Sequence, residues 1–318
     1  MKALSVIPGK AGSAEMVDWP EPQAREDALL VRSRGIGICG TDVEIIAGDY
    51  GEAPPAEERL ILGHEALGEV LQAPPDSGFE PGQLVVGVVR RPDPEPCDHC
   101  AQDEWDMCRN DHYLESGIKQ RHGYAQELYT LEPEFAVPVD AELGDLGVLV
   151  EPASVVAKAG TVALHILQRS AVPPRTALIT GAGPIGLLAA LATTQYGLDT
   201  YVVDIVESGP KPDLVRDLGA TYHAGPIHEL TIAADIVIEC TGVGSVAREA
   251  SRSASPGAVI ALTGIASSQS VADIDQNLMN KNMVLRNVVV FGSVNAGRGH
   301  YDSAVRISAG WTPTGCGV

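Results

Sequence analysis

The chain has few aromatic and few basic residues, and each shortage excludes a class of protein. Only 4% of its 318 residues are Phe, Trp or Tyr, so its core must be built from small aliphatic side chains, as in many α/β proteins. Lys and Arg number 22 against 42 Asp and Glu, which gives a formal net charge of -20. Nucleic acid and anionic membrane surfaces would repel such a chain, so neither is an expected partner. The acidity fits either a salty cytoplasm or a general need for solubility.

The sequence also lacks the marks of export and of a membrane anchor. The amino terminus, MKALSVIPGK, has neither the apolar stretch nor the small-residue cleavage site of a signal peptide, so we expect a cytoplasmic protein. Residues 176–198 carry no charge and are long enough to raise the question of a membrane helix. Gly181, Gly183, Pro184 and Gly186 interrupt that stretch at its start, so no membrane span is expected.

Length and texture predict an α/β protein of two domains, at roughly 100 to 200 residues per domain. Up to about Glu151 the pattern is of short β-type runs separated by Pro/Gly-rich turns, which indicates a mostly β, barrel-like domain. Beyond it, strands alternate with helices, which is typical of a doubly wound parallel sheet. The strands predicted there are 176–182, 199–205, 234–240, 257–264 and 287–294, the helices are 184–197, 211–219 and 245–254, and a helix over 153–167 joins the halves.

A glycine-rich turn opens the second half. Gly181, Gly183 and Gly186 form GAGPIG between a predicted strand and an Ala/Leu-rich helix. The first glycine permits a tight turn, the second lets the backbone approach a pyrophosphate, and the third allows close packing of helix on strand. The amino terminus of the helix then attracts the phosphates. Asp204 ends the next strand, near the expected spacing of about 20 residues. This context predicts a dinucleotide site.

The residue after that strand bears on the choice of cofactor. Asp204 would accept hydrogen bonds from the ribose hydroxyls and repel a 2′-phosphate, which favours NAD over NADP. The alternative is a solvated aspartate at a strand end. Lys211 lies nearby in the sequence and could recruit a phosphate, so NADP stays open.

Potential metal ligands occur in three separate motifs. Cys39 lies in GICGTD, His64 and Glu65 in GHEALGEV, and Glu151 in LVEPAS. A thiolate, an imidazole and carboxylates suit zinc, and a catalytic zinc keeps one position open for water or substrate. Alone, such a cysteine is usually a core residue and such a histidine a buried polar group. The set as a whole indicates a catalytic metal centre.

These motifs carry a family resemblance. GICGTD followed by PAEERLILGHEALGEV and then GAGPIG resembles the zinc-containing medium-chain alcohol dehydrogenases/reductases over nearly the whole chain. VRRP, ESGIKQRHGYAQE, LVEPASVVAKA and NKNMVLRNVVVFGSVNAG resemble the glucose 1-dehydrogenase branch. The resemblance implies a GroES-like catalytic domain over 1–154, completed by 296–318, and a Rossmann domain over 155–295. It also implies oxidation of an aldose such as D-glucose at C1 to the lactone, with hydride transfer to NAD or NADP.

Two alternatives to this function stay open. One is a related zinc polyol, secondary-alcohol or threonine dehydrogenase with a differently lined pocket. The other is a truncated nucleotide-binding protein without turnover, because a fold does not fix a function. The run SAGWTPTGCGV at residues 308–318 has no periodicity where the family continues with a helix and a strand. We therefore expect either a disordered tail or a reading frame lost near Ile307.

The resemblance also assigns roles to residues. Cys39 and His64 would bind zinc, Glu65 and Glu151 would be exchangeable or water-linked ligands, and Thr41 would relay the proton. Residues that would contact the sugar are Thr41, Glu115, Glu151 and Asn295. Residues that would contact the cofactor are Gly181, Gly183, Pro184, Ile185, Gly186, Asp204, Thr263, Ser293, Val294 and Asn295. His122 lies in the same branch motif and is given no role.

A second group of cysteines lies within residues 97–108. The structural zinc lobe of the resembled family spaces four cysteines as C-x2-C-x2-C-x7-C. Cys97, Cys100 and Cys108 match the last three, and Pro94 stands at the first. Asp93 or Glu95 could replace the missing ligand, or the lobe could be metal-free.

The resemblance finally implies an oligomer. In the family the edge strand near residues 287–292 extends the sheet across a two-fold axis, and an apolar unpaired edge would be a liability. A homo-dimer or homo-tetramer is expected.

Overall fold

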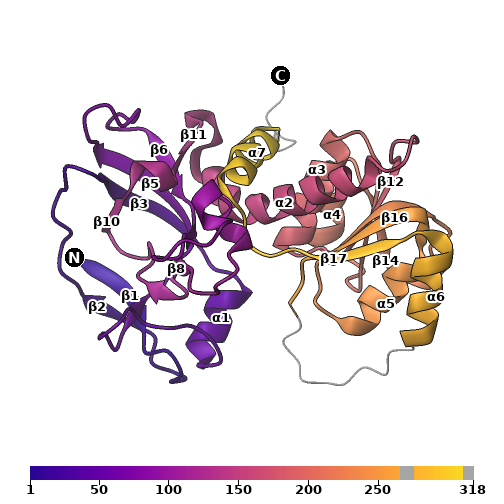
Figure 1. Cartoon of the computed structure of the whole chain (residues 1–318), viewed down its shortest axis with the longest axis horizontal. Helices are drawn as coiled ribbons and strands as arrows, with labels where there is room; N and C mark the ends of the chain where they lie inside the picture. The colour runs from indigo at the N-terminus through magenta and orange to yellow at the C-terminus, as the bar shows by residue number, and fades with distance from the viewer. Residues whose placement is uncertain (266–275, 311–318) are drawn as a thin grey trace. The chain divides into compact units, whose positions relative to one another are not determined.

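The computed structural model describes residues 1–265 and 276–310, and these form two compact units. Met1–Ser154 and Asn295–Ala309 make up the first unit. The second unit consists of Val155–Val294, apart from residues 266–275, and Gly310. Figure 1 shows the elements of each unit.

The first unit is built from sheets whose strand pairs are antiparallel except for one. Its largest sheet has five strands in the order β10-β3-β5-β6-β11, at Leu128–Leu131, Leu29–Gly37, Glu65–Gln72, Leu84–Gly87 and Ala136–Val139. A second sheet has the order β2-β1-β4, at Glu15–Asp18, Lys2–Val6 and Leu60–Ile61. A small third sheet has the order β7-β8-β9, at Arg90–Arg91, Leu114–Ser116 and Gln120–Arg121. Alternate side chains of the strands, such as Tyr129 and Leu131 on β10, are buried, as expected for sheets with one face on a core.

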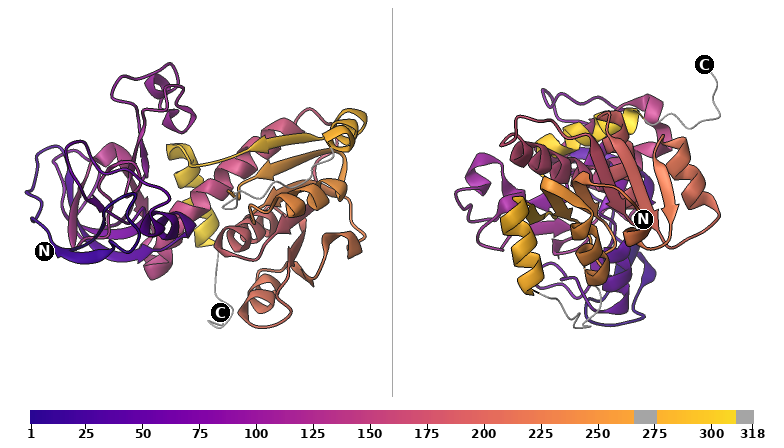
Figure 2. Two further views of the ribbon diagram at one scale, coloured as in Figure 1. Left: turned by 90° about the horizontal axis from the view of Figure 1, so that it is seen from below. Right: turned by 90° about the vertical axis from the view of Figure 1, so that its right-hand side faces the viewer.

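The second unit is a six-stranded parallel sheet in the order β14-β13-β12-β15-β16-β17. The strands span Thr221–Ala224, Asp199–Asp204, Thr176–Thr180, Ala234–Glu239, Ala254–Leu262 and Val289–Gly292. The helices between them are α3 at Pro184–Gln195, α4 at Pro210–Asp217, α5 at Gly244–Arg252 and α6 at Gln276–Arg286. The strand order reverses at β12, so helices lie on both sides of the sheet (Figure 2). The predicted architecture, a mostly β domain with a doubly wound parallel sheet, is confirmed.

Several element boundaries differ from the prediction. Helix α2 spans Val150–Leu167, so it begins three residues before the predicted start and includes Glu151 in its first turn. Helix α5 ends at Arg252 because β16 already begins at Ala254, where a longer helix and a later strand were predicted. Strand β14, helix α6 and two further helices, α1 at Gly40–Ala47 and α7 at Arg298–Ala309, were not predicted.

Helix α7 adds a late segment of the chain to the first unit. It buries Tyr301, Ala304 and Ser308. The expectation of an aberrant tail falls largely on residues 311–318, which lie outside the described residues.

One helical run, Ala141–Leu167, is long and apolar enough to cross a membrane by length and composition alone. In its most apolar window, 61% is buried inside the protein, which is a property of core helices. The stretch weighed from the sequence, residues 176–198, instead divides into β12, a turn and α3.

Candidate metal centre and dinucleotide site

The motif GICGTD forms a helix cap that holds a thiol. Cys39 is the N-cap of α1, and its Sγ accepts a hydrogen bond from the backbone N–H of Thr41 at 3.3 Å. In return, the backbone N–H of Cys39 donates to Oδ2 of Asp42 at 3.0 Å. This reciprocal capping box satisfies two donors that a helix start would otherwise leave free. It also fixes the direction of the Cys39 side chain.

Three of the four predicted catalytic ligands come together. Sγ of Cys39 lies 3.1 Å from Nε2 of His64. These atoms and a carboxylate oxygen of Glu65 all lie within 4.8 Å of one another. With zinc–ligand distances of about 2.0 to 2.3 Å and tetrahedral geometry, ligand atoms lie about 3.5 Å apart. The spacing and the donor types therefore fit a zinc ion.

The other ring nitrogen of His64 faces a carboxylate. Nδ1 of His64 lies 3.4 Å from Oδ1 of Asp42, whose side chain is fully buried. Neither atom has another hydrogen-bond partner among the described residues. A carboxylate behind a metal-binding histidine sets its tautomer and orientation and makes it a stronger ligand. Asp42 therefore has a second role besides capping α1, one that the sequence analysis missed.

The position of the Glu65 side chain depends on a glycine on the neighbouring strand. Gly37 on β3 pairs with Glu65 on β5, and a Cβ at Gly37 would collide with the Glu65 carboxylate. Burial raises the pKa of Glu65 above its ordinary value. A carboxyl group in this position favours its neutral form unless a cation lies nearby.

Glu151, the fourth predicted ligand, is not in the group of three, because its carboxylate does not lie within 4.8 Å of all three donor atoms. Its side chain is buried at the start of α2, and the Tyr301 hydroxyl donates to its Oε1 at 3.5 Å. The same hydroxyl accepts a hydrogen bond from the backbone N–H of Val89 at 3.2 Å. Burial raises the pKa of Glu151 to about 8. Its separation from the group of three suits a ligand linked through water better than a direct one.

The balance of charge around His64 also suits a cation. Burial by itself would lower the pKa of His64, but hydrogen bonds with Asp42 and Cys39 and the charge of Glu151 outweigh it and raise that pKa well above its ordinary value. The imidazole thus lies among acidic side chains, and none of the hydrogen bonds described above joins one of these side chains to a Lys or an Arg. A divalent cation would supply that balance.

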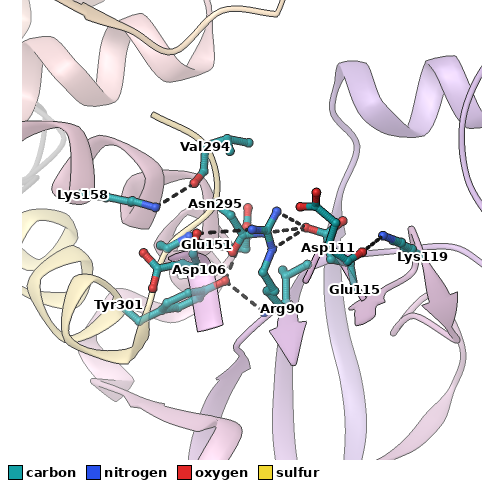
Figure 3. A network of polar contacts seen from close by, with 12 residues as sticks. Arg90, Asp106, Asp111, Glu115, Lys119, Glu151, Lys158, Val294, Asn295 and Tyr301 are labelled. Carbon is teal, nitrogen blue, oxygen red and sulfur yellow. Dashed lines mark hydrogen bonds and ion pairs between the residues drawn. The ribbon is translucent and has the colours of Figure 1, made fainter. Parts of the chain in front are cut away.

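The predicted sugar contacts are linked to each other. Nδ2 of Asn295 donates to Oε1 of Glu115 at 2.8 Å, and Arg90 binds the same oxygen (Figure 3). Asn295 adopts a positive φ of 56°, which places it in a left-handed turn after β17. Thr41 is half-buried beside Cys39. The sequence analysis gave no role to Arg90, although VRRP was among its motifs.

The glycines of GAGPIG have the geometry predicted for them. Gly181 has a φ of +86°, a conformation that side chains rarely adopt. A Cβ at Gly183, the N-cap of α3, would meet nothing within 4 Å, so open space lies in front of the helix start. A Cβ at Gly186 would collide with the carbonyl oxygen of Gly181. Pro184 and Ile185 form the first turn of α3. The turn therefore has the shape that a pyrophosphate requires.

Asp204 is engaged by its own surroundings. Its carboxylate accepts hydrogen bonds from the backbone N–H of Ala182 at 2.7 Å and from Lys211 Nζ at 3.0 Å. Burial would raise the pKa of Asp204, but these donors outweigh it and lower that pKa. Lys211 thus neutralises the charge that would repel a 2′-phosphate.

The remaining predicted cofactor residues follow β16 and β17. Oγ1 of Thr263 donates to the carbonyl of Glu239 at 2.8 Å. The hydroxyl of Ser293 is buried without a hydrogen-bond partner in the described chain. The carbonyl of Val294 accepts from Lys158 Nζ at 3.0 Å (Figure 3). These residues end adjacent parallel strands, where ligands of such sheets bind.

The second cysteine group is assembled but incomplete. The Sγ atoms of Cys97, Cys100 and Cys108 lie within 4.8 Å of one another, and no described Asp, Glu or His joins them. Asp93 instead accepts hydrogen bonds from the backbone of Glu95 and from Asn110, both at 2.8 Å. Closed structural zinc sites almost always have four ligands, so the described residues do not fit one.

His122 has a structural environment. Its Nδ1 accepts from the backbone N–H of Ile61 at 3.2 Å, its Nε2 lies 2.9 Å from Oε2 of Glu57, and its ring packs edge-on against Trp19.

Comparison with known proteins identifies two matching domains. Residues 25–141 match the alcohol dehydrogenase GroES-like domain, and residues 144–311 match the glucose dehydrogenase C-terminus. The glucose 1-dehydrogenase of Methanocella arvoryzae is 38% identical over 314 residues, which cover 96% of this chain and 87% of that protein. That of Thermoproteus tenax is 39% identical, with the same coverage of both. The structure of Haloferax mediterranei glucose dehydrogenase in complex with NADP, Zn and gluconolactone has a TM-score of 0.90 at 30% identity, covering 98% of this chain and 90% of that one.

The fold and the matched domains define a zinc-dependent, NAD(P)-dependent dehydrogenase. The chain belongs to the zinc-containing medium-chain dehydrogenase/reductase family, in its glucose dehydrogenase branch. The resemblance inferred from the motifs is confirmed.

Proposed function

We propose that this enzyme oxidises an aldose, D-glucose foremost, at C1 to the lactone and transfers the hydride to NAD or NADP. The observation that carries the proposal is the group of Cys39, His64 and Glu65, whose donor atoms fit a zinc ion. The names of the relatives, and the zinc, NADP and gluconolactone in the Haloferax mediterranei structure, support the reaction.

When zinc is bound by these residues, it supplies a Lewis acid that stabilises negative charge developing on the substrate oxygen. The protein prepares the site in advance. The capping box fixes Cys39, and Asp42 holds His64 by its far nitrogen. Gly37 leaves room for Glu65, and the buried Glu151 would hold the zinc through a water.

The proton of the substrate hydroxyl needs a path out of the site. Thr41 is a half-buried residue in the first turn of α1, beside Cys39, and we assign its hydroxyl the first step of that path. Glu115, Glu151 and Asn295 contact the other hydroxyls of the sugar.

In the second unit, the turn Gly181–Gly186 binds the pyrophosphate at the start of α3. We assign Thr263, Ser293, Val294 and Asn295, which follow strands β16 and β17, to the nicotinamide end of the cofactor. Because Lys211 neutralises Asp204, either NAD or NADP can be accommodated. The cofactor performs the hydride chemistry, and the protein supplies placement and charge.

The test is an assay of the purified protein with glucose, galactose, xylose, sorbitol and threonine, each with NAD and with NADP. We expect an aldose to give the highest kcat/KM and the lactone as product. Chelation should abolish turnover, zinc should restore it, and Cys39→Ala should not respond to zinc. A higher kcat/KM with sorbitol or threonine would favour the related zinc dehydrogenases. Full turnover by Cys39→Ala after chelation would contradict the zinc mechanism.

A cytoplasmic location and a homo-dimer or homo-tetramer complete the proposal. Sedimentation of the purified protein distinguishes these oligomers from a monomer.

A further inference from the structure

The carboxylate of Glu115 has two oxygens in very different surroundings. Oε1 accepts three hydrogen bonds, from Nε and Nη2 of Arg90 at 3.1 and 3.0 Å and from Nδ2 of Asn295 at 2.8 Å. Oε2 accepts none from the described residues, and it is not among the buried atoms that lack a partner. One oxygen of Glu115 is therefore saturated, and the other remains open to a ligand.

The side chain of Arg90 is itself fixed by several neighbouring residues. On β7 it pairs with Glu115 of β8, and its Nη1 donates to the carbonyl of Asp106 at 3.4 Å (Figure 3). Its guanidinium also stacks on the ring of Tyr113, at 3.6 Å from the ring centre. Only 6% of Arg90 and 5% of Glu115 is exposed. Both of the Arg90 N–H groups that bind Glu115 donate to Oε1, so a guanidinium fixed in this way holds that one oxygen in place.

Stability alone does not account for this arrangement. Removing two charges from water costs several kcal/mol per ion, and a buried pair is often no more stable than apolar residues of the same volume. What the pair provides is orientation, because the saturation of Oε1 by Arg90 and Asn295 leaves Oε2 as the only free acceptor of Glu115.

We propose that Arg90 is a positioning residue that fixes Glu115 so that Oε2 alone accepts a hydrogen bond from one particular hydroxyl of the sugar, and that this bond selects sugars that carry that hydroxyl. The inference rests on the proposed oxidation of an aldose. Arg90 acts through Glu115 and does not itself touch the substrate.

The expected size of the effect follows from the charge of the acceptor. A hydrogen bond to a charged group contributes enough to change an equilibrium about ten- to hundredfold, and a buried acceptor left without its partner adds to that discrimination. A wild-type enzyme should thus lose about ten- to hundredfold in kcat/KM with one of the monodeoxy-D-glucoses.

The experiment measures kcat/KM for D-glucose and for its 2-, 3-, 4- and 6-deoxy analogues with four forms of the enzyme: wild type, Arg90→Lys, Glu115→Gln and the double variant. Arg90→Lys keeps the charge but loses the planar fork. We expect it to lower kcat/KM for glucose, largely through KM, while the value for the critical deoxy analogue changes little. Discrimination at that one hydroxyl should fall to within about threefold. The double variant should show the same discrimination between glucose and the critical deoxy analogue as Glu115→Gln alone, because both substitutions remove the same bond.

Arg91 offers a matched control on the same strand. It is also buried, but it pairs with Glu132 at 3.7 Å and donates to the Tyr124 hydroxyl at 3.1 Å. Arg91→Lys should keep the discrimination of the wild type even if its melting temperature falls. If Arg90→Lys does not fold, Tyr113→Leu, which removes the ring beneath the guanidinium, should loosen the same discrimination.

Each outcome decides a separate question. If no aldose is a substrate of the wild type, the proposed function fails. If glucose is oxidised but no single hydroxyl controls kcat/KM, or if Arg90→Lys slows glucose and all its analogues equally, the proposed function stands and the role of Arg90 is refuted.

Discussion

Replacing Gly37 with alanine should weaken zinc binding by displacing Glu65. The new Cβ would overlap the Glu65 carboxylate and lie 2.9 Å from Cβ and 3.2 Å from Cδ of the same residue. A separation of 2.9 Å is shorter than real Cβ contacts, so Glu65 must move. Overpacking of this kind costs about 1 to 3 kcal/mol. Because the end of the Glu65 side chain can swing away, we expect the metal-free protein to lose about 1 kcal/mol, at the lower end of that range.

The substitution should lower the stability of the zinc-bound protein more than that of the metal-free protein. Disturbing a group that supports a metal site weakens affinity about 10- to 100-fold. By linkage, the zinc-saturated protein then loses about 1.4 to 2.7 kcal/mol more than the metal-free protein does. The assay is a competition titration with a chromophoric chelator, combined with thermal melts with and without zinc.

Gly35 provides the control for this prediction. It lies on the same strand, and a Cβ there would meet nothing within 4 Å. Gly35→Ala should bind zinc as the wild type does. Unchanged zinc affinity in Gly37→Ala would show that Glu65 is not part of the metal centre.

Three other substitutions probe the site and its supports. Asp42→Asn removes the charge behind His64 and should weaken zinc binding about 10- to 100-fold in the same titration; equal affinity would contradict an orienting role. Gly186→Ala places a Cβ against the carbonyl of Gly181. The free energy of unfolding in urea should therefore fall by about 1 to 3 kcal/mol, and fluorescence titration should show weaker NADH binding. Wild-type curves in both measurements would refute the close packing. Tyr301→Phe leaves a backbone N–H without its acceptor, so the free energy of unfolding should fall by about 1 to 3 kcal/mol, and a change below about 0.5 kcal/mol would be inconsistent with the bond.

Features that depend on short contiguous segments could be predicted from the sequence. The cap in GICGTD and the turn in GAGPIG are formed by neighbouring residues, so their spacing predicts their geometry. The alternation of β-type runs and the strand–helix texture were enough for the fold class, since each depends on a local period.

Features that depend on distant contacts could not be predicted. Tyr301 reaches Glu151 across 150 positions of the chain, and Arg90 binds Glu115 across 25. No local pattern distinguishes such a tyrosine or arginine from one that merely fills a core. Asp42 shows a further limit, because its role in the helix cap concealed the contact with His64.

The proposed activity depends on the binding of one zinc ion by Cys39, His64 and Glu65. Anomalous diffraction at the zinc edge from crystals of the active enzyme tests it most directly. We expect one ion about 2.3 Å from Sγ of Cys39 and about 2.0 to 2.1 Å from Nε2 of His64. Active crystals with no zinc signal at that position would contradict it.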